Sequence, residues 1–262
     1  MAQIKAEKPW HGIKQAAFAA AADPDAPQVT VKLPAAWGQA AADALAAILP
    51  EARRIDIADA AQGWIAPIAA RAAAADLSPE TGTALHELLA SRRGSPSADI
   101  WRNRPGAVPG FVFNIAAYLA EGAFDAASLA ADIRLAVTAL TLAAPGAHRL
   151  AIGFTDLNLF LTRLGLDYGT QAARDTAVTL TAFIGAQAHI ASAALRAHGT
   201  APGYAIAMPK LPEHCAVPGL LAATAAAQEN AAGGTTTRHE ALLGFAADPA
   251  VEALLGAEVC NF

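Results

Sequence analysis

The chain has 262 residues, of which 55% are hydrophobic and 16% are charged, and its formal net charge is −5. This composition excludes a disordered chain, whose profile is polar and rich in charge. The negative balance gives no general attraction to nucleic-acid phosphates or to anionic membrane surfaces, so we expect neither as a partner.

The first third of the chain predicts strands alternating with helices. Apolar residues alternate over 29–33 as in a strand, and 35–49 has the pattern of a helix. A second strand is expected at 54–58, followed by helices at 60–75 and 79–90.

Residues 91–109 are rich in Arg, Gly, Pro, Ser and Asn, which is the chemistry of a loop. We therefore expect a boundary here, between an amino-terminal β-α segment (1–95) and a second domain (96–262). In the second domain we expect strands at 110–115, 150–154, 204–208 and 241–246 and helices at 125–142, 156–164, 170–198, 218–231 and 249–255. This alternation predicts an α/β fold with a largely parallel sheet.

Membrane and metal sites are not expected. The longest apolar stretch, 129–145, contains Asp132 and Arg134 and is shorter than the ~20 residues that a membrane span needs. The first eight residues lack the basic-then-apolar order of a secretory signal, so we expect a cytoplasmic protein. Two cysteines, Cys215 and Cys260, are too few for a disulfide framework and lack the paired spacing of a zinc site.

Four blocks of the chain follow one known pattern in order. Residues 112–118 (V-F-N-I-A-A-Y) resemble the strand V-C-N-L-x-S-I, with phenylalanine in place of the cysteine. Residues 122–125 (G-A-F-D) match the turn G-x-F-D that follows this strand. Residues 149–168 follow R-x-I-G-x-G-x-x-x-L-x-x-x-L-x-x-L-G-x-x-Y, 190–195 follow A-S-x-x-L-A, and 238–246 follow R-N-A-x-L-L-x-I-A. Together these blocks resemble the large subunit of ribonucleotide reductase, and its vitamin-B12-dependent branch in particular.

The resemblance covers residues 98–262 and implies an α/β barrel, which in the family has ten strands. Because residues 1–95 show no match, we expect a partial or remodelled reductase-like barrel, rich in helix, with an extra amino-terminal β-α segment. A partial barrel leaves open sheet edges, so either the amino-terminal strands complete the sheet or a second copy does, and we prefer a homodimer.

The residues on which reductase chemistry depends are absent. The resemblance places Arg102 where the radical cysteine would stand, and a guanidinium stays protonated and forms no thiyl radical. Phe113 stands at the second reducing cysteine. The family's phosphate loop P-T-G-T corresponds to residues 247–250, with Pro249, which has no N–H, in place of the glycine. We therefore expect no catalytic residues, no cofactor and no ribonucleotide reduction.

The loop that the resemblance places over the barrel mouth contains four arginines, Arg92, Arg93, Arg102 and Arg104, with Trp101 among them. Guanidinium groups bind phosphate or carboxylate, and tryptophan offers a stacking face. We expect the loop to face the carboxyl ends of the strands, where further polar residues would join it. The candidate ligand site consists of Trp101, Arg102, Arg104, Asn114, Asp156 and Arg238. A solvated basic loop is the competing interpretation.

Two other groups of residues give weaker indications. Glu213, His214 and Cys215 are adjacent in sequence and cannot easily converge on one metal ion. His189, on a helix with Gln187 and Ser192, is interpreted as a packing histidine rather than a base.

Three functions remain open at this point. The leading hypothesis is a reductase-like binding or assembly module without reductase activity. The first alternative is a binder of an anionic small molecule, such as a nucleotide, at the arginine loop. The second is an enzyme with unknown chemistry in the remodelled pocket.

Overall fold

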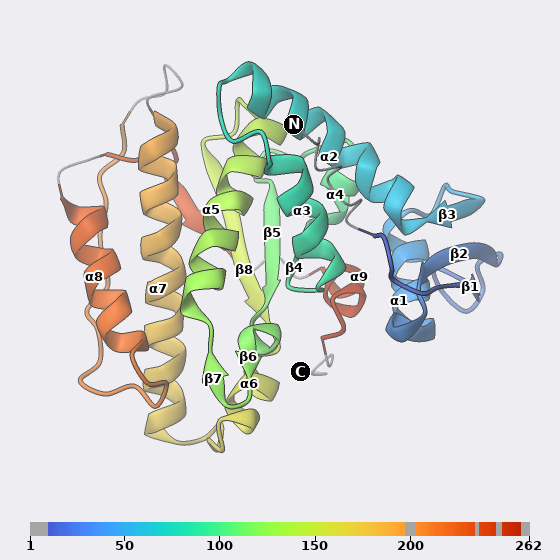
Figure 1. The fold of residues 1–262 in the computed structure, drawn as a ribbon. Coiled ribbons are helices and arrows are strands. Elements are labelled where there is room, and N and C mark those ends of the chain that lie inside the picture. The colour runs from blue at the N-terminus through green and yellow to red at the C-terminus, as the bar shows by residue number, and fades with distance from the viewer. Residues whose placement is uncertain (1–9, 197–202, 234–235, 245–247, 258–262) are drawn as a thin grey trace, which may run out of the picture.

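The computed structural model describes residues 10–196, 203–233, 236–244 and 248–257. Within these ranges the chain is a mixed α/β fold (Figure 1). The strands are β1 (Gln15–Ala20), β2 (Val29–Pro34), β3 (Arg54–Asp56), β4 (Gly94–Pro96), β5 (Gly110–Asn114), β6 (Leu119–Ala120), β7 (Ala123–Phe124), β8 (Arg149–Thr155) and β9 (Ala241–Leu243). The α-helices are α1 (Gly38–Ile48), α2 (Ile57–Ala74), α3 (Thr81–Ala90), α4 (Ala98–Trp101), α5 (Ala126–Ala143), α6 (Leu157–Arg163), α7 (Gln171–Arg196), α8 (Leu220–Ala232) and α9 (Pro249–Leu254).

The central sheet has the strand order β4-β5-β8-β9. Strands β5, β8 and β9 are parallel, and β4 is antiparallel to β5. All five residues of β5 are buried, as expected of a parallel strand that is covered on both faces. The expected α/β fold is therefore confirmed, but the described strands form an open sheet and no closed barrel.

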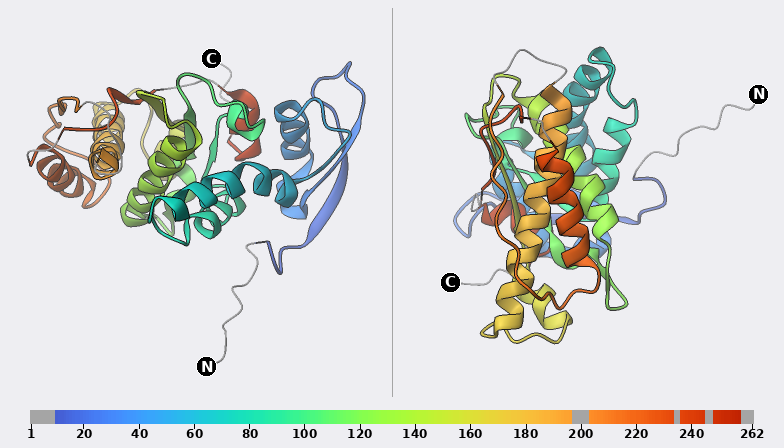
Figure 2. Two further views of the ribbon diagram at one scale, coloured as in Figure 1. Left: turned by 90° about the horizontal axis from the view of Figure 1, so that it is seen from above. Right: turned by 90° about the vertical axis from the view of Figure 1, so that its left-hand side faces the viewer.

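Helices surround this sheet unevenly (Figures 1 and 2). Helix α5 packs against β5 and β8, and α3 packs against β4. Helix α7 lies beside the edge strand β9 and carries α8 on its outer side, while α9 and α1 lie together at the opposite side of the sheet. The long apolar helices α5 and α7 have the length and composition of membrane spans, but 50% and 67% of their apolar windows are buried inside the protein.

The amino-terminal strands do not complete the central sheet; they form a separate sheet in the order β1-β2-β3. Helix α1 packs against β1 and β2. It also closes part of the outer edge of β1, because Gln39 Nε2 donates to the carbonyl of Ala19 (2.8 Å) and Asp43 Oδ1 accepts from the N–H of Ala21 (3.2 Å).

One hydrophobic core extends across the sequence from β1 to α9. Arg92 strengthens the connection between its ends. Its guanidinium donates to the carbonyls of Leu254 (3.0 Å) and Ala253 (3.2 Å) at the end of α9, and it lies 5.0 Å from the centre of the Trp37 ring. The first and last helices are thus held together by a residue that precedes the central sheet.

Candidate functional site

The arginine loop follows β4 and is organised by one carboxylate. Asp99 accepts hydrogen bonds from the backbone N–H groups of Ile100 (3.0 Å) and Gly106 (2.6 Å) and from the hydroxyl of Ser97. Ser97 is in turn bonded to Gly110, the first residue of β5. The loop therefore lies at the amino end of β5, and the expectation that it faces the carboxyl ends of the strands is wrong. The cause is the antiparallel direction of β4, which the sequence did not indicate.

The aromatic and basic side chains of this loop are used in three different ways. Trp101 is buried, and its indole donates to Ser95 Oγ (3.0 Å). Arg102 donates to the carbonyls of Ile48 (2.7 Å) and Ala47 (3.3 Å), so it caps the carboxyl end of α1. Arg104 is exposed. These three residues do not form a common anion site.

The other three candidate residues are divided between opposite ends of the sheet. Asn114 and Asp156 are buried at the carboxyl ends of β5 and β8, and Asn114 accepts from the N–H of Ala116 and donates to the carbonyl of Leu255. Arg238 precedes β9 at the amino end and donates to the carbonyl of Pro145 (3.1 Å). The six candidate residues therefore do not converge on one site.

Near the carboxyl end of β5, a charged residue of the 91–109 stretch has a structural partner. Arg93 Nε lies 3.3 Å from Asp132 Oδ2, which accepts from the hydroxyl of Tyr118 (2.8 Å). Burial raises the pKa of Asp132, while Tyr118 and Arg93 oppose that rise. Burial and the neighbouring Asp132 both raise the pKa of Tyr118. The ion pair and the hydrogen bond of Asp132 therefore link the start of β4, α5 and the turn after β5.

A second buried set surrounds Ser192, which lies on the same helix as His189. The partner in the structure is His239, whose Nδ1 lies 2.9 Å from Ser192 Oγ and whose Nε2 lies 3.4 Å from Thr141 Oγ1. His239 is 1% exposed, and burial, with smaller contributions from Arg238 and His148, lowers its pKa to about 4. A neutral, enclosed histidine of this kind connects the start of β9 to α5 and α7.

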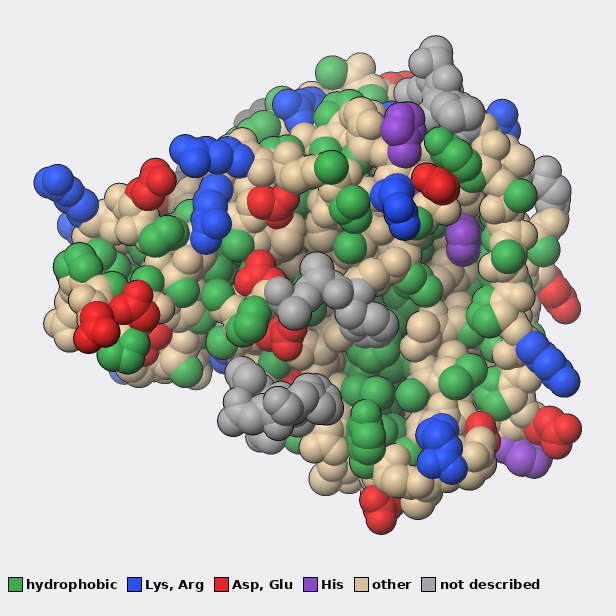
Figure 3. All heavy atoms as spheres, turned by 180° about the vertical axis from the view of Figure 1, so that it is seen from behind, with side chains coloured by type: hydrophobic (Ala, Val, Ile, Leu, Met, Phe, Trp, Pro, Cys, Tyr) green, Lys and Arg blue, Asp and Glu red, His purple; other side chains and the backbone are tan. Residues whose placement is uncertain are grey.

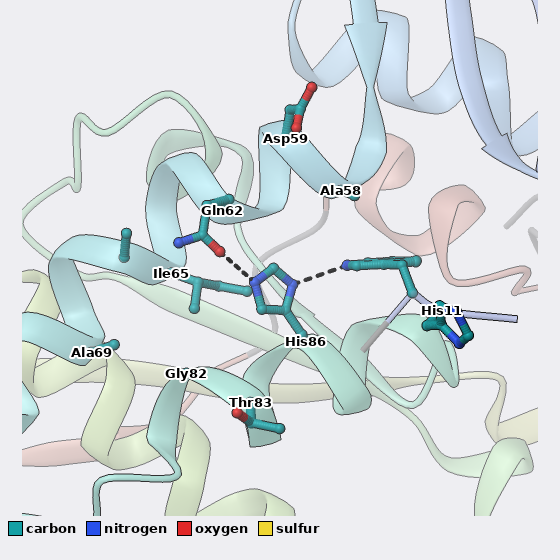
Figure 4. A pocket seen from close by; sticks show the side chains of 11 residues that line it. His11, Ala58, Asp59, Gln62, Ile65, Ala69, Gly82, Thr83 and His86 are labelled. Carbon is teal, nitrogen blue, oxygen red and sulfur yellow. Dashed lines mark hydrogen bonds between the residues drawn. The ribbon is translucent and has the colours of Figure 1, made fainter. Parts of the chain in front are cut away.

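An open groove of about 640 Å³ runs between α2, α3 and the segment before β1 (Figure 4). Sequence reasoning did not identify it. Its lining combines apolar and polar side chains, and both the apolar Ile65 and the polar His86 are buried. The lining residues are Trp10, His11, Ala58, Asp59, Gln62, Ile65, Ala66, Ala69, Gly82, Thr83 and His86.

His86 is the most constrained polar residue of the groove. It is 7% exposed, its Nδ1 lies 3.1 Å from Trp10 Nε1, and its Nε2 lies 2.9 Å from Gln62 Oε1. An indole N–H can only donate, so Nδ1 accepts and the imidazole proton is on Nε2. Burial lowers the pKa of His86. One signal was present in the sequence: a histidine beside the apolar Leu85, Leu88 and Leu89 on a helix.

The charges of the described surface favour no polyanion. Among the residues that the structure describes, no lysine or arginine lines the groove, and Asp59 is its one carboxylate. On the face opposite to that of Figure 1, basic and acidic side chains are interspersed (Figure 3). Within the described ranges no three His, Cys, Asp or Glu residues are grouped to hold a metal ion. Cys215 is half-buried against the core, and Cys260 lies outside the described residues.

Comparisons with protein-family models and with curated proteins gave no match.

Proposed function

We propose that this chain is a ligand-binding module of the cytoplasm, related to the reductase large subunit but without ribonucleotide reduction. On this proposal the open sheet is a remodelled part of the family's barrel. The order of the strands supports it, since the blocks at 112–118, 149–168 and 238–246 include β5, β8 and β9, which are neighbouring parallel strands.

The proposal is carried by what the residues at the positions matched to the reductase machinery contact in the structure. Arg102, at the radical cysteine, caps α1. Phe113, at the reducing cysteine, is fully buried. Asp248, at the position matched to the phosphate loop, accepts from the N–H groups of Val251 (3.3 Å) and Ala98 (3.0 Å), so its carboxylate binds backbone donors at the starts of α9 and α4. All three residues stabilise the fold.

We assign ligand binding to the groove between α2 and α3. A lining that joins apolar side chains with a few polar groups is typical of small-molecule sites. The described part of the lining contains the carboxylate of Asp59 and no lysine or arginine, which favours a neutral or cationic ligand over a phosphate. The alternative, an anionic ligand at the arginine loop, has less support because Arg102 already donates to α1.

A thermal-shift screen tests this assignment. The probes are neutral nucleosides and aromatic amines, with nucleotides, sugar phosphates and cobalamin as comparison. A ligand at 100 times its Kd stabilises by about 2.7 kcal/mol, which raises Tm by several degrees in a chain of this size. Ala66→Trp fills the groove at an exposed position, and Ala70→Trp is the matched control outside it.

The assignment requires that Ala66→Trp abolishes the stabilisation and that Ala70→Trp keeps it. Stabilisation by nucleotides that Arg104→Ala removes would instead support the arginine loop. A panel in which nothing stabilises the parent would refute a small-molecule function of this kind.

Assembly into a homodimer is a separate proposal. Strand β4 is buried, whereas the other edge strand, β9, carries Leu243 with 41% of its surface exposed. A second copy could extend the sheet only at β9. Light scattering that reports a monomer at every concentration would refute the dimer.

A further inference from the structure

We propose that Trp10 is a latch at the end of the groove, and that protonation of His86 releases it. The proposal rests on the proposed function for its purpose, because it regulates access to the same groove. It is nevertheless tested without any ligand, so the latch and the binding function can fail independently.

The latch is defined by the contacts of one indole. Trp10 donates to His86 Nδ1 at 3.1 Å, and its ring is edge-on to the rings of His86 and Trp37, with centroids 6.2 Å apart in both cases. Both ends of the contact line the groove. The segment at residues 10–13 is therefore held to α3 by one directional hydrogen bond together with ring packing.

Protonation removes the acceptor of this bond. Nε2 already carries a proton and donates to Gln62, so the added proton must go to Nδ1 (Figure 4). The indole N–H of Trp10 would then face another N–H, and the favourable contact becomes a repulsive one. The bond to Gln62 is unaffected, because its direction is the same in both forms. Only the Trp10 side of the histidine is switched.

The charged groups around the latch are few. Asp59 on α2 and His11 of the amino-terminal segment share the groove with His86, and Arg92 lies over the far partner ring, Trp37. Within the described ranges, Trp10 and Gln62 are the hydrogen-bond partners of His86, and α5 and β4 contribute none. Burial, rather than a neighbouring charge, lowers the pKa of His86. Release of Trp10 is therefore expected in acidic solution, below the ordinary histidine pKa.

Fluorine NMR of the full chain labelled with 5-fluorotryptophan tests the latch. Four tryptophans give four resonances, and Trp10→Phe identifies that of Trp10. Between pH 8 and pH 5 the Trp10 resonance should move toward the position of free fluorotryptophan, with a midpoint below about 6.5, the ordinary histidine value. The resonance of Trp101, which is buried and donates to Ser95 Oγ rather than to His86, should move little.

Two variants separate His86 from its surroundings. His86→Asn keeps an acceptor oxygen near the Nδ1 position but does not titrate, so the transition should disappear. His11→Asn changes the exposed histidine of the groove and should leave the midpoint in place. Imidazole carbon resonances of the parent protein give the midpoint of His86 without any substitution. A Trp10 resonance that is independent of pH, or whose midpoint differs from that of His86, overturns the latch.

Discussion

His239 offers a direct measurement of how strongly the interior holds a histidine neutral. It is 1% exposed and its ring nitrogens face the hydroxyls of Ser192 and Thr141. The backbone N–H of His239 donates to Ser192 Oγ (3.2 Å). The hydroxyl proton of Ser192 is therefore available to donate to Nδ1 of the His239 ring. We expect His239→Asn to keep an acceptor for Ser192 while removing the titratable group.

The size of the effect follows from linkage. The pKa of His239 is lowered from 6.5 to about 4 in the folded protein, so the unfolded chain binds the additional proton between these values. The stabilisation is fully present above pH 6.5 and is lost as the pH falls toward 4. Because one pH unit corresponds to ~1.4 kcal/mol, the total loss is about 3 kcal/mol.

Urea unfolding followed by circular dichroism at pH 7, 6, 5 and 4 gives the free energies of unfolding. His86 and His189 also have pKa values lowered by burial, and their contribution cancels when the variant is subtracted from the parent. The difference between parent and His239→Asn should therefore shrink by about 3 kcal/mol from pH 7 to pH 4. His214→Asn, an exposed control, should show no such change. A difference that stays constant with pH would refute the enclosed, neutral state of His239.

Substitutions of Arg92, of the loop arginines and of Cys215, with an activity assay, test the fold and the proposal. Arg92→Ala should destabilise the protein by about 2 kcal/mol in urea unfolding, because it removes the hydrogen bonds to α9 and the contact with Trp37. Arg92→Gly should cost less, because residue 92 has a φ of 54°, which glycine adopts without strain. Arg102→Ala should cost about 1 kcal/mol and Arg104→Ala less than about 0.5 kcal/mol; equal costs in the same assay would contradict the capping role. Purified protein given a ribonucleotide, cobalamin and a dithiol should yield no deoxynucleotide that chromatography can detect, and Cys215→Ser should behave like the parent. A thiol-dependent deoxynucleotide product would contradict the proposal that the reductase positions have lost their chemistry.

Much of the fold could be predicted from local pattern. Helix α5 begins at the N-cap Asp125, which accepts from Ser128, and its apolar period matches the expected helix 125–142. Strands β5 and β8 also lie where buried runs predicted them. Strand β1 was not predicted, because Gln15–Ala20 is mostly alanine, a strong helix former, and becomes a strand only through pairing with β2. Residues 204–208 make a single bridge at Tyr204 instead of the expected strand.

The candidate site was less predictable because it depends on direction in space. Arginines close in sequence are separated by the short strand β4, whose antiparallel pairing with β5 takes Arg102 to the amino end of the sheet. The groove escaped notice for a related reason: Trp10 and His86 are 76 residues apart and meet only after α2 and α3 have packed. Composition and spacing carry no information on such contacts.

The packing of α1 against α9 has a consequence during synthesis. About 200 residues separate these two helices, so at ~5–20 residues per second the ribosome needs roughly 10 to 40 seconds to produce the second after the first. Throughout that interval α1 lacks the contact with α9 that it makes in the folded protein. The nascent chain therefore carries an incompletely packed α1 until α9 has been synthesised.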